Sequence, residues 1–395
     1  MEYKRIFFNK EFRGFCIYRL IFGISYSIMI PIIPLFFKSV GMTTVVIGMI
    51  ISGYGVSKTI IQLPFGIVTD KIGDKFMLVI SLFLMGLIPI SYMFADKSFS
   101  LGLIYVLQGA ILGMAAPATY SVLARTLDKA NRGKCTGLAA AVFTLGGGIG
   151  AAIAGIILEK TNNFSITFYI SAIGIFISLF YVVLKIKKVK KENEVKSEGI
   201  KTIIKEIRKS GFTSKIIILS ASSFLGDFIY SCVVALIHFY GQDVLGVSTM
   251  YTSSIISVYL LVFGLGAPLA GYVSDLVGNR KQFLFSFIIM DLALLGLIIT
   301  RNISLFTIII VIYFLGATFL NGALQNSLSQ FGDYNKIKGL IFGIVGASES
   351  LGYAVGPLIT AHIYNFNNNY LFLVLLIVSV LVSVVYLIFF KNASI

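Results

Sequence analysis

Twelve apolar stretches of about 20 to 26 residues, separated by short polar segments, run through the chain, and each is long enough to cross a bilayer as a helix. The stretches are too long and too evenly apolar for barrel strands, and a backbone in lipid must satisfy its own N–H and C=O groups. Each stretch is therefore predicted to be a helix. The predicted spans lie at residues 14–37, 43–68, 76–94, 99–124, 133–158, 165–184, 216–240, 249–274, 282–300, 304–328, 338–363 and 368–390.

Composition supports this assignment. Of 395 residues, 57% are apolar and only 12% are charged, which is more apolar surface than a water-soluble fold can bury. The sequence thus predicts an all-α, multi-pass membrane protein. Its three cysteines, Cys16, Cys135 and Cys232, lie far apart without metal or redox spacing, so we expect neither a metal site nor a cofactor.

The basic residues are distributed asymmetrically between the two sides of the membrane. With twelve spans, 26 of the 32 Lys and Arg residues fall on the side of the chain termini, four fall on the opposite side, and Arg19 and Lys58 fall inside spans. The positive-inside rule places both termini in the cytoplasm, with the protein in the plasma (inner) membrane. The net charge of +15 therefore reflects topology, and no nucleic-acid partner is expected.

A long polar segment, residues 185–215, separates the sixth and seventh spans. Four isoleucines within it recur at helical spacing, at Ile200, Ile203, Ile204 and Ile207, and eleven Lys and Arg residues surround them. This pattern predicts a short amphipathic helix that lies on anionic lipid headgroups, while a solvated linker remains an alternative.

The two halves of the chain repeat each other at a nearly fixed offset. Gly66, Asp70 and Gly73 recur 205 residues later as Gly271, Asp275 and Gly278. We therefore predict two pseudo-symmetric six-helix bundles, residues 1–184 and 216–395, joined by the basic linker, with a substrate site between them at mid-membrane.

The repeated segment also indicates a family. The sequence GIVTDKIGDK at residues 66–75, with its second copy at 271–281, resembles the signature between helices 2 and 3 of the major facilitator superfamily, and the resemblance extends over essentially the whole chain. Within that superfamily the chain looks most like the 12-helix drug:proton antiporters. The resemblance implies a secondary transporter whose bundles rock to expose a cavity to each side in turn, and which exports hydrophobic or amphipathic small molecules in exchange for protons. We expect it to be a monomer.

The resemblance also implies a latch on the cytoplasmic side. Asp70 would face the N-terminal end of helix 11, where a positive helix terminus favours a carboxylate. Asp74 stands where the signature usually has Arg, which weakens the basic half of the latch. The latch candidates are Gly66, Asp70, Lys71, Gly73, Lys75, Gly271, Asp275, Gly278 and Arg280.

Helices 5 and 11 carry glycines spaced four residues apart, which lets helix backbones approach closely. Gly146 and Gly150, and in the second half Gly352 and Gly356, are predicted to let these helices roll against the opposite bundle. Generic close packing is the alternative.

Few ionisable groups lie deep inside the spans, and each is a candidate functional group. Lys58 and Glu349 lie about eleven residues, or ~16 Å, from the cytoplasmic ends of helices 2 and 11. We predict that they pair across the seam between the halves and that Glu349 couples transport to protons; separate partners or water for each remain an alternative. Asp227 is the second coupling candidate, and Asp291 is expected in a structural pairing.

The cavity helices carry amides and aromatic side chains that suit a neutral or amphipathic compound. The candidate substrate contacts are Tyr26, Tyr105, Gln108, Tyr230, Asn321 and Gln325. No nucleotide-hydrolysis or metalloprotease motif is present, so an enzyme is not expected. Tyr105 replaces an Arg of the family pattern, which leaves uptake or facilitated diffusion of a neutral metabolite as a second reading. A transporter-like receptor without turnover is a third.

Overall fold

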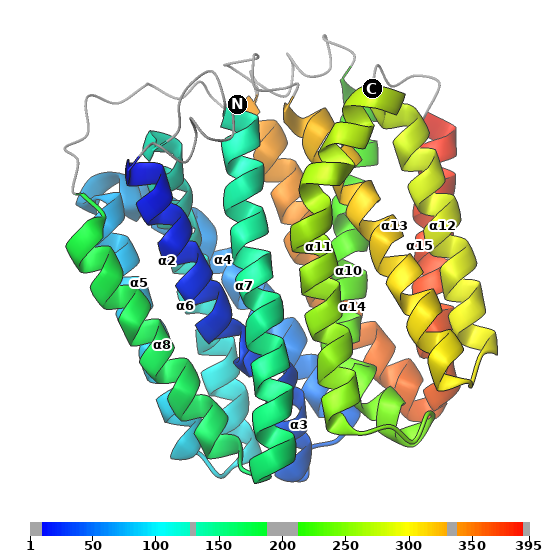
Figure 1. Ribbon diagram of the computed structural model, residues 1–395, viewed down its shortest axis with the longest axis horizontal. Coiled ribbons are helices and arrows are strands. Elements are labelled where there is room, and N and C mark those ends of the chain that lie inside the picture. Colours follow the sequence, from blue (N-terminus) through cyan, green and yellow to red (C-terminus); the bar gives the residue numbers. More distant parts are fainter. Residues whose placement is uncertain (1–9, 127–131, 188–211, 330–337, 390–395) are drawn as a thin grey trace. The chain divides into compact units, whose positions relative to one another are not determined.

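The computed structural model describes residues 10–126, 132–187, 212–329 and 338–389, and these residues form long α-helices (Figure 1). The first half contributes α2 (Lys10–Ser27), α3 (Met29–Ser39), α4 (Thr44–Ile72), α5 (Asp74–Met93), α6 (Ser98–Thr126), α7 (Arg132–Thr161) and α8 (Phe164–Lys185). The second half contributes α10 (Thr213–Asp243), α11 (Thr249–Val277), α12 (Asn279–Ile299), α13 (Ile303–Ser329), α14 (Lys338–Phe366), the 3-10 turn η3 (Asn368–Tyr370) and α15 (Leu371–Phe389).

These helices confirm the predicted all-α membrane architecture. Within the described ranges, eleven helical segments are long and apolar enough to cross a membrane, and α14, with 29 residues, covers the remaining predicted span. The first span differs from its prediction because it is interrupted at Ile28, between α2 and α3. Pro31 has no N–H to donate to the carbonyl of Ser27, so the regular helix pattern breaks there.

The chain divides into two compact units. The first unit comprises Met1–Lys191 with Val233–Leu265, and the second comprises Glu192–Cys232 with Gly266–Ile395. Residues 233–265 join the first unit because α11 approaches α7 closely: the Ser257 hydroxyl donates to the carbonyl oxygen of Gly148 at 2.7 Å. The repeat-based boundaries at 184 and 216 stay a prediction, and most of the segment 185–215 with its isoleucines lies outside the described residues.

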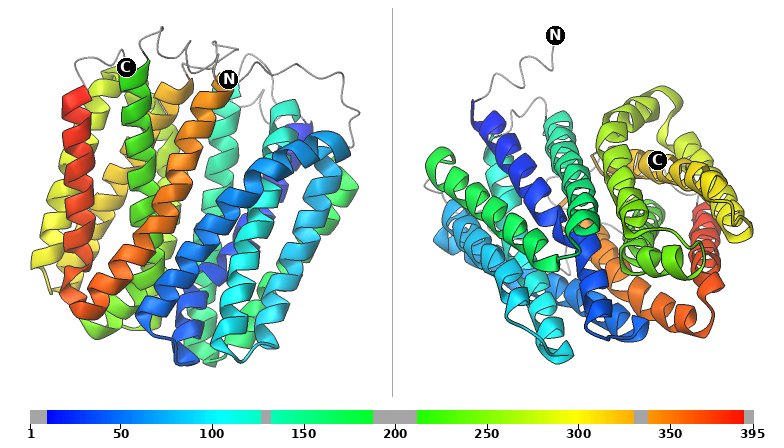
Figure 2. Two further views of the ribbon diagram at one scale, coloured as in Figure 1. Left: turned by 180° about the vertical axis from the view of Figure 1, so that it is seen from behind. Right: turned by 60° about the horizontal axis from the view of Figure 1, so that its bottom comes forward.

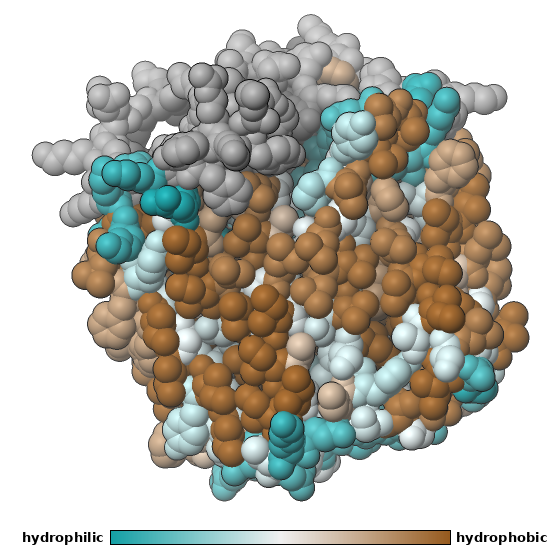
Figure 3. All heavy atoms as spheres, viewed as in Figure 1, coloured by the Kyte–Doolittle hydropathy of each residue, from teal (hydrophilic) through white to brown (hydrophobic). Residues whose placement is uncertain are grey.

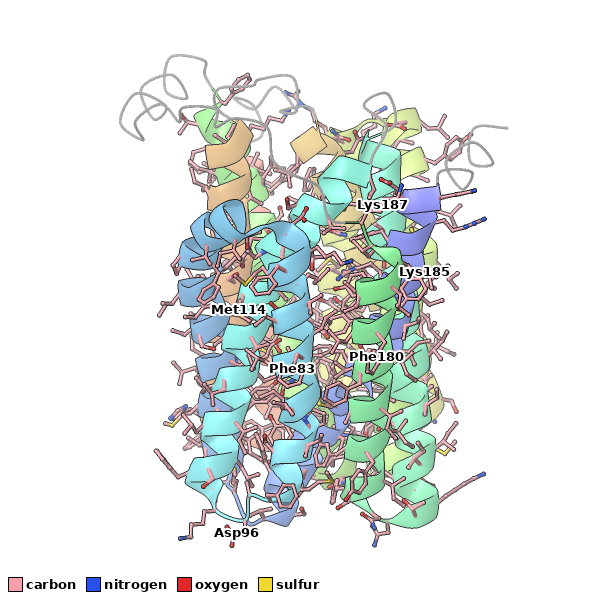
Figure 4. All side chains as sticks on the ribbon, turned by 90° about the vertical axis from the view of Figure 1, so that its left-hand side faces the viewer. Phe83, Asp96, Met114, Phe180, Lys185 and Lys187 are labelled. Atoms are coloured by element: carbon pink, nitrogen blue, oxygen red, sulfur yellow. The ribbon has the colours of Figure 1, made fainter. Side chains whose placement is uncertain are left out.

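Helices of the first unit pack in pairs that are distant in sequence: α4 along α6, α2 along α7 and α5 along α8 (Figure 2). The start of α2 lies close to the segment that follows α8, because the Lys187 ammonium forms an ion pair with the Glu11 carboxylate at 3.0 Å. Figure 4 shows Lys187 at one end of the helices and Asp96 at the other, with Phe83 and Phe180 between them. Charged side chains therefore mark the ends of these helices, and apolar side chains lie along their length.

The same distribution is visible on the surface. On the face in Figure 3, hydrophobic side chains cover the middle of the helices and hydrophilic ones gather at the ends. Many large apolar side chains are exposed, for example Phe180 at 64% and Leu269 at 64%. A lipid environment explains this exposure, because apolar side chains on the outside of the helices can contact the hydrocarbon core of the bilayer.

The internal repeat extends to backbone geometry. The described glycines with positive φ are Gly41 and Gly73 in the first half and Gly246 and Gly278 in the second, with φ of 89°, 105°, 64° and 83°. Each pair is separated by the same 205 residues as the signature. The turns at both ends of the second span in each half are therefore built in the same way, from glycines whose conformation other residues rarely adopt.

Candidate functional site

A cluster of buried polar and aromatic side chains lies inside the first unit, where α2, α4, α5 and α6 meet. The hydroxyls of Tyr26 and Tyr54 are 2.6 Å apart, and the Tyr92 hydroxyl donates to Gln108 Oε1 at 2.8 Å. Gln108 also lies near the Tyr26 hydroxyl, so the two pairs form one cluster. The ring of Tyr105 stacks on Tyr54 with centroids 4.9 Å apart. The structure thus brings together three predicted cavity residues, Tyr26, Tyr105 and Gln108.

Helix packing fixes this cluster. Gly109 on α6 has no side chain, so the backbone of α4 approaches it: a Cβ there would lie 2.4 Å from the carbonyl oxygen of Tyr54. Gly113 receives the carbonyl of Lys58 in the same way, also at 2.4 Å. This close approach brings the backbone of α4 at Tyr54 and Lys58, which are one helical turn apart, against Gly109 and Gly113 of α6.

Two cations lie within the spans of the first unit. The Arg19 guanidinium lies over the ring of Phe143, 4.0 Å from the ring centroid. This cation–π contact is attractive because the face of an aromatic ring is negatively polarised. Lys58 is half-buried and lies near enough to Tyr26 for its charge to act on that hydroxyl. Lys58 therefore belongs to the tyrosine and glutamine cluster.

The second unit holds the other candidates. The ring of Tyr230 on α10 lies 6.2 Å from that of Tyr353 on α14, and Gln325 Nε2 is 3.5 Å from Asn321 Oδ1 on α13. Glu349 on α14 is exposed within this unit, and Asp227 on α10 is half-buried. Lys58 and Glu349 lie in different units, so their pairing stays a prediction.

The first copy of the signature forms the turn between α4 and α5. Gly73 adopts a φ of 105°, and the Lys75 ammonium donates to the carbonyl oxygen of Val183 at 2.8 Å, near the C-terminal end of α8. That position suits a cation, because free carbonyls give a helix C-terminus negative character. Asp74 is buried and accepts from the Ser121 hydroxyl at 3.3 Å. The side chains of Asp70 and Lys71 lie outside what the structure describes, so the latch with helix 11 stays a prediction.

In the second copy the donor stands at the equivalent position, but it binds a different carboxylate. Asn326, which lies 205 residues after Ser121, donates to Asp275 Oδ1 at 2.9 Å. Asp275 is the equivalent of Asp70, whereas Ser121 binds Asp74. The Tyr386 hydroxyl donates to the carbonyl of Arg280 at 2.7 Å. Each copy therefore anchors its turn to neighbouring helices of its own half.

The predicted contact glycines have partners within their own half. A Cβ at Gly150 would lie 2.1 Å from the carbonyl oxygen of Ile24, and one at Gly146 would lie 2.7 Å from that of Leu20. Gly352 and Gly356 meet α10 in the same way, with the carbonyl oxygens of Phe224 at 2.2 Å and Phe228 at 2.7 Å. These close approaches correspond to the alternative of generic close packing, because each glycine contacts α2 or α10, a helix of its own half. A role in contact with the opposite bundle stays a prediction.

Asp291 is half-buried and accepts hydrogen bonds from two serines of the second unit, as expected for a structural pairing. Its two carboxylate oxygens accept the hydroxyls of Ser379 and Ser383 on α15, the latter at 3.0 Å. The two serines are one helical turn apart and face α12 together. The carboxylate therefore joins α12 to α15 in a region where water offers no alternative donor.

We expect Asp291→Ala to lower the thermal stability of the purified protein. Hydrogen bonds to a charged group contribute about 1.5–3 kcal/mol each. The substitution leaves the Ser379 hydroxyl without this acceptor, whereas Ser383 can still donate to the carbonyl oxygen of Ser379, 3.0 Å away. Melting in detergent measures the effect. Asp291→Asn is the matched control, because it keeps an acceptor, and it should lose much less stability. Equal melting temperatures for Asp291→Ala and the wild type would contradict the pairing.

Sequence reasoning missed four residues of these clusters: Tyr54, Tyr92, Ser379 and Ser383. Two of the signals were available, since Tyr54 precedes Lys58 by one helical turn and the serines are spaced i, i+4 on an otherwise apolar helix. Tyr92 could not have been found, because its contact with Gln108 depends on how α5 meets α6.

A family sequence model described as Major Facilitator Superfamily matches residues 15–336. The chain belongs to the major facilitator superfamily. Its relatives are transporters, and the chain is a multi-pass membrane transporter of this superfamily. Both the recognition from the signature and the predicted fold are confirmed.

Relatives and solved structures give further detail. The quinolone resistance protein NorA of Staphylococcus aureus (strain COL) is 24% identical over 357 residues, which cover 89% of this chain and 88% of NorA. An uncharacterized MFS-type transporter of Methanocaldococcus jannaschii, MJ1560, is 24% identical over 205 residues, so the chain spans 53% of the length of that relative. The crystal structure of the nucleoside transporter NupG matches with a TM-score of 0.76 at 12% identity, covering 96% of this chain and 100% of NupG.

Proposed function

We propose that this superfamily member is a proton-coupled exporter of hydrophobic or amphipathic small molecules. The observation that carries the proposal is the similarity to NorA, a quinolone resistance protein, because it extends over 89% of the chain and includes both halves. Two carboxylates available for proton uptake, Glu349 and Asp227, lie within predicted spans, which supports coupling. The two signature copies and their glycine turns support alternation by rocking of two six-helix bundles.

Each candidate residue has a defined role in this proposal. Glu349 takes up and releases the coupling proton, with Asp227 as the second candidate, and Lys58 pairs with Glu349 in one state. Asp70 and the neighbouring Lys71 and Lys75 hold the cytoplasmic side closed, with both chain termini on that side. The substrate contacts are those on the cavity helices, and the segment 185–215 rests on anionic headgroups.

The test is an efflux panel in cells that express the chain, with and without a protonophore. The compounds should differ in charge and hydrophobicity and include a quinolone such as norfloxacin. We expect expression to lower the accumulation of at least one compound and the protonophore to abolish that effect. Efflux that persists after the proton gradient has collapsed would contradict proton coupling.

Uptake or facilitated diffusion of a neutral metabolite is the second candidate, and the observation that favours it is Tyr105. This tyrosine stands where the family pattern has an Arg, and its ring is buried against Tyr54. A facilitator would equilibrate its substrate at the same rate with or without the protonophore. A receptor without turnover would bind compounds but change their accumulation in neither condition.

A further inference from the structure

Helices of both predicted bundles meet in the first unit, near the end of α3. The Lys38 ammonium on α3 lies 4.9 Å from the centroid of the Phe239 ring on α10. The Glu159 carboxylate on α7 accepts the backbone N–H of Met250 at 3.1 Å, where the positive N-terminal end of α11 favours a negative charge. Because α3 and α7 belong to one predicted bundle and α10 and α11 to the other, these contacts must break if the bundles separate at this end. We call them the outer gate.

His238 lies within the outer gate and is completely buried. Its Nδ1 lies 2.5 Å from the Thr252 hydroxyl oxygen on α11, and the carbonyl of Pro31 on α3 lies near the imidazole. The second ring nitrogen, Nε2, is also buried and has no hydrogen-bond partner among the described residues. The imidazole therefore lies where α3, α10 and α11 meet, and one of its two nitrogens is unpaired.

No carboxylate is placed to balance a positive charge on His238. The ionisable side chains at these helix ends are Lys38 on α3, Glu159 and Lys160 on α7, Tyr240 and Asp243 on α10, and Tyr251 on α11. In the part of the chain that the structure describes, the imidazole interacts with Thr252 and Pro31 and with none of these groups. A buried charge without a counter-ion is strongly unfavourable, so the imidazole is neutral while the outer gate is closed.

Opening of the outer gate changes the state of this imidazole. Pro31 and Thr252 lie on helices of different predicted bundles, so separation of the bundles exposes His238 to water. An imidazole in water takes up a proton as the pH falls through about 6.5. The open gate therefore binds a proton that the closed gate does not, and a lower pH must favour the open gate.

We propose that His238 is a proton-binding site of the outer gate, which takes a proton from water when the gate opens and returns it to water when the gate closes. The inference rests on the proposed alternation of two bundles and adds a proton site to it, at the end of the spans opposite the chain termini. Acidification outside the cell then favours the outward-open state. This site is separate from the coupling candidates Glu349 and Asp227.

The test measures the opening of the gate as a function of pH. Spin labels are attached to cysteines introduced at Lys97, in the turn between α5 and α6, and at Gln242, near the end of α10; both positions are exposed. The three native cysteines are replaced by alanine, and distances are measured by double electron–electron resonance in lipid nanodiscs. We expect the ratio of long to short distances to rise about tenfold between pH 7.5 and pH 5.5, as linkage to one imidazole requires.

His238→Gln should remove this tenfold change, because glutamine keeps a polar side chain but takes up no proton. His362→Gln is the matched control: it removes the other of the two histidines, which is exposed on α14, and it should respond to pH like the wild type. A wild type whose distances do not depend on pH overturns the inference. So does a His238→Gln variant that responds as strongly as the wild type.

Nitrogen-15 NMR of histidine-labelled protein reads the imidazole directly and decides the question if His238→Gln does not fold. With two histidines in the chain, His362→Gln assigns the signals. We expect neutral His238 at pH 7.5 and a protonated fraction that grows with the open fraction as the pH falls. Protonated His238 in a closed gate, or neutral His238 in a gate that is open at pH 5.5, contradicts the proposal.

Neither measurement uses a substrate or a proton gradient, so the inference and the proposed function can fail separately. If a protonophore abolishes efflux but the gate does not respond to pH, the exporter proposal stands and only the role of His238 is lost. If the gate responds through His238 but efflux persists with the protonophore, the proton site stands and proton-coupled export is lost.

Discussion

Replacing Glu349 with Gln is expected to abolish proton-driven accumulation of substrate while leaving exchange down a substrate gradient partly intact. A pH gradient of one unit supplies about 1.4 kcal/mol per proton, enough for roughly tenfold accumulation in the wild type at one proton per cycle. Glutamine cannot take up or release that proton, so the accumulation ratio should fall to about one. Glu349 is exposed on α14 within its unit. Uptake into inside-out vesicles with an imposed pH gradient measures the ratio.

Asp291→Asn is the matched control for this experiment. Its carboxylate also lies within a span of the second half, but it is held by Ser379 and Ser383. We expect this variant to accumulate substrate normally. Wild-type accumulation by Glu349→Gln would remove Glu349 from coupling. If Asp227→Asn then lost accumulation, Asp227 would take the coupling role.

Gly150→Ala is expected to destabilise the first unit strongly. The new Cβ would lie 2.1 Å from the carbonyl oxygen and 2.9 Å from the carbonyl carbon of Ile24, and both are backbone atoms. Relief of this overlap requires α7 to move away from α2. Overpacking of a well-packed interior costs about 1–3 kcal/mol and occasionally more, which exceeds the gain of about 1 kcal/mol from replacing a helical glycine with alanine. Thermal melting in detergent and the yield of folded protein measure the loss.

Gly137→Ala is the control in the same helix, because no heavy atom of a neighbouring element lies within 4 Å of its Cβ position. This variant should be as stable as the wild type or slightly more stable. Gly356→Ala, with a closest backbone distance of 2.7 Å to Phe228, should fall between the two. A Gly150→Ala variant as stable as Gly137→Ala would show that α7 and α2 do not pack as described.

Most of the fold could be predicted because bilayer thickness sets the length of each apolar stretch. The predicted span 249–274 and the helix Thr249–Val277, for example, begin at the same residue. The repeat also predicts Gly73 and Gly278 as equivalent positions, and both adopt a positive φ. The break at Ile28 was not predicted, although Pro31 was visible. A proline in a membrane helix kinks or breaks it depending on the neighbouring helices, and a single sequence does not define those neighbours.

The site was less predictable for a related reason. Residue type identified Tyr26, Gln108 and Lys58, since polar groups are rare in the spans. Their common location depends on close contact between α4 and α6, which Gly109 and Gly113 permit but do not specify. The same limit explains the contact glycines: the spacing of Gly146 and Gly150 predicts a close helix contact, but not whether the partner is α2 or the opposite bundle.

If the chain exchanges protons for substrate as proposed, the coupling is reciprocal, and a substrate gradient alone should move protons in the opposite direction. The most direct measurement uses proteoliposomes that contain a pH-sensitive dye and start at equal pH on both sides, with a gradient of the most strongly exported compound from the efflux panel. We expect the wild type to move protons against the direction of substrate flow, and Glu349→Gln to move substrate without a pH change. Substrate flux by the wild type with no change in internal pH would contradict the account.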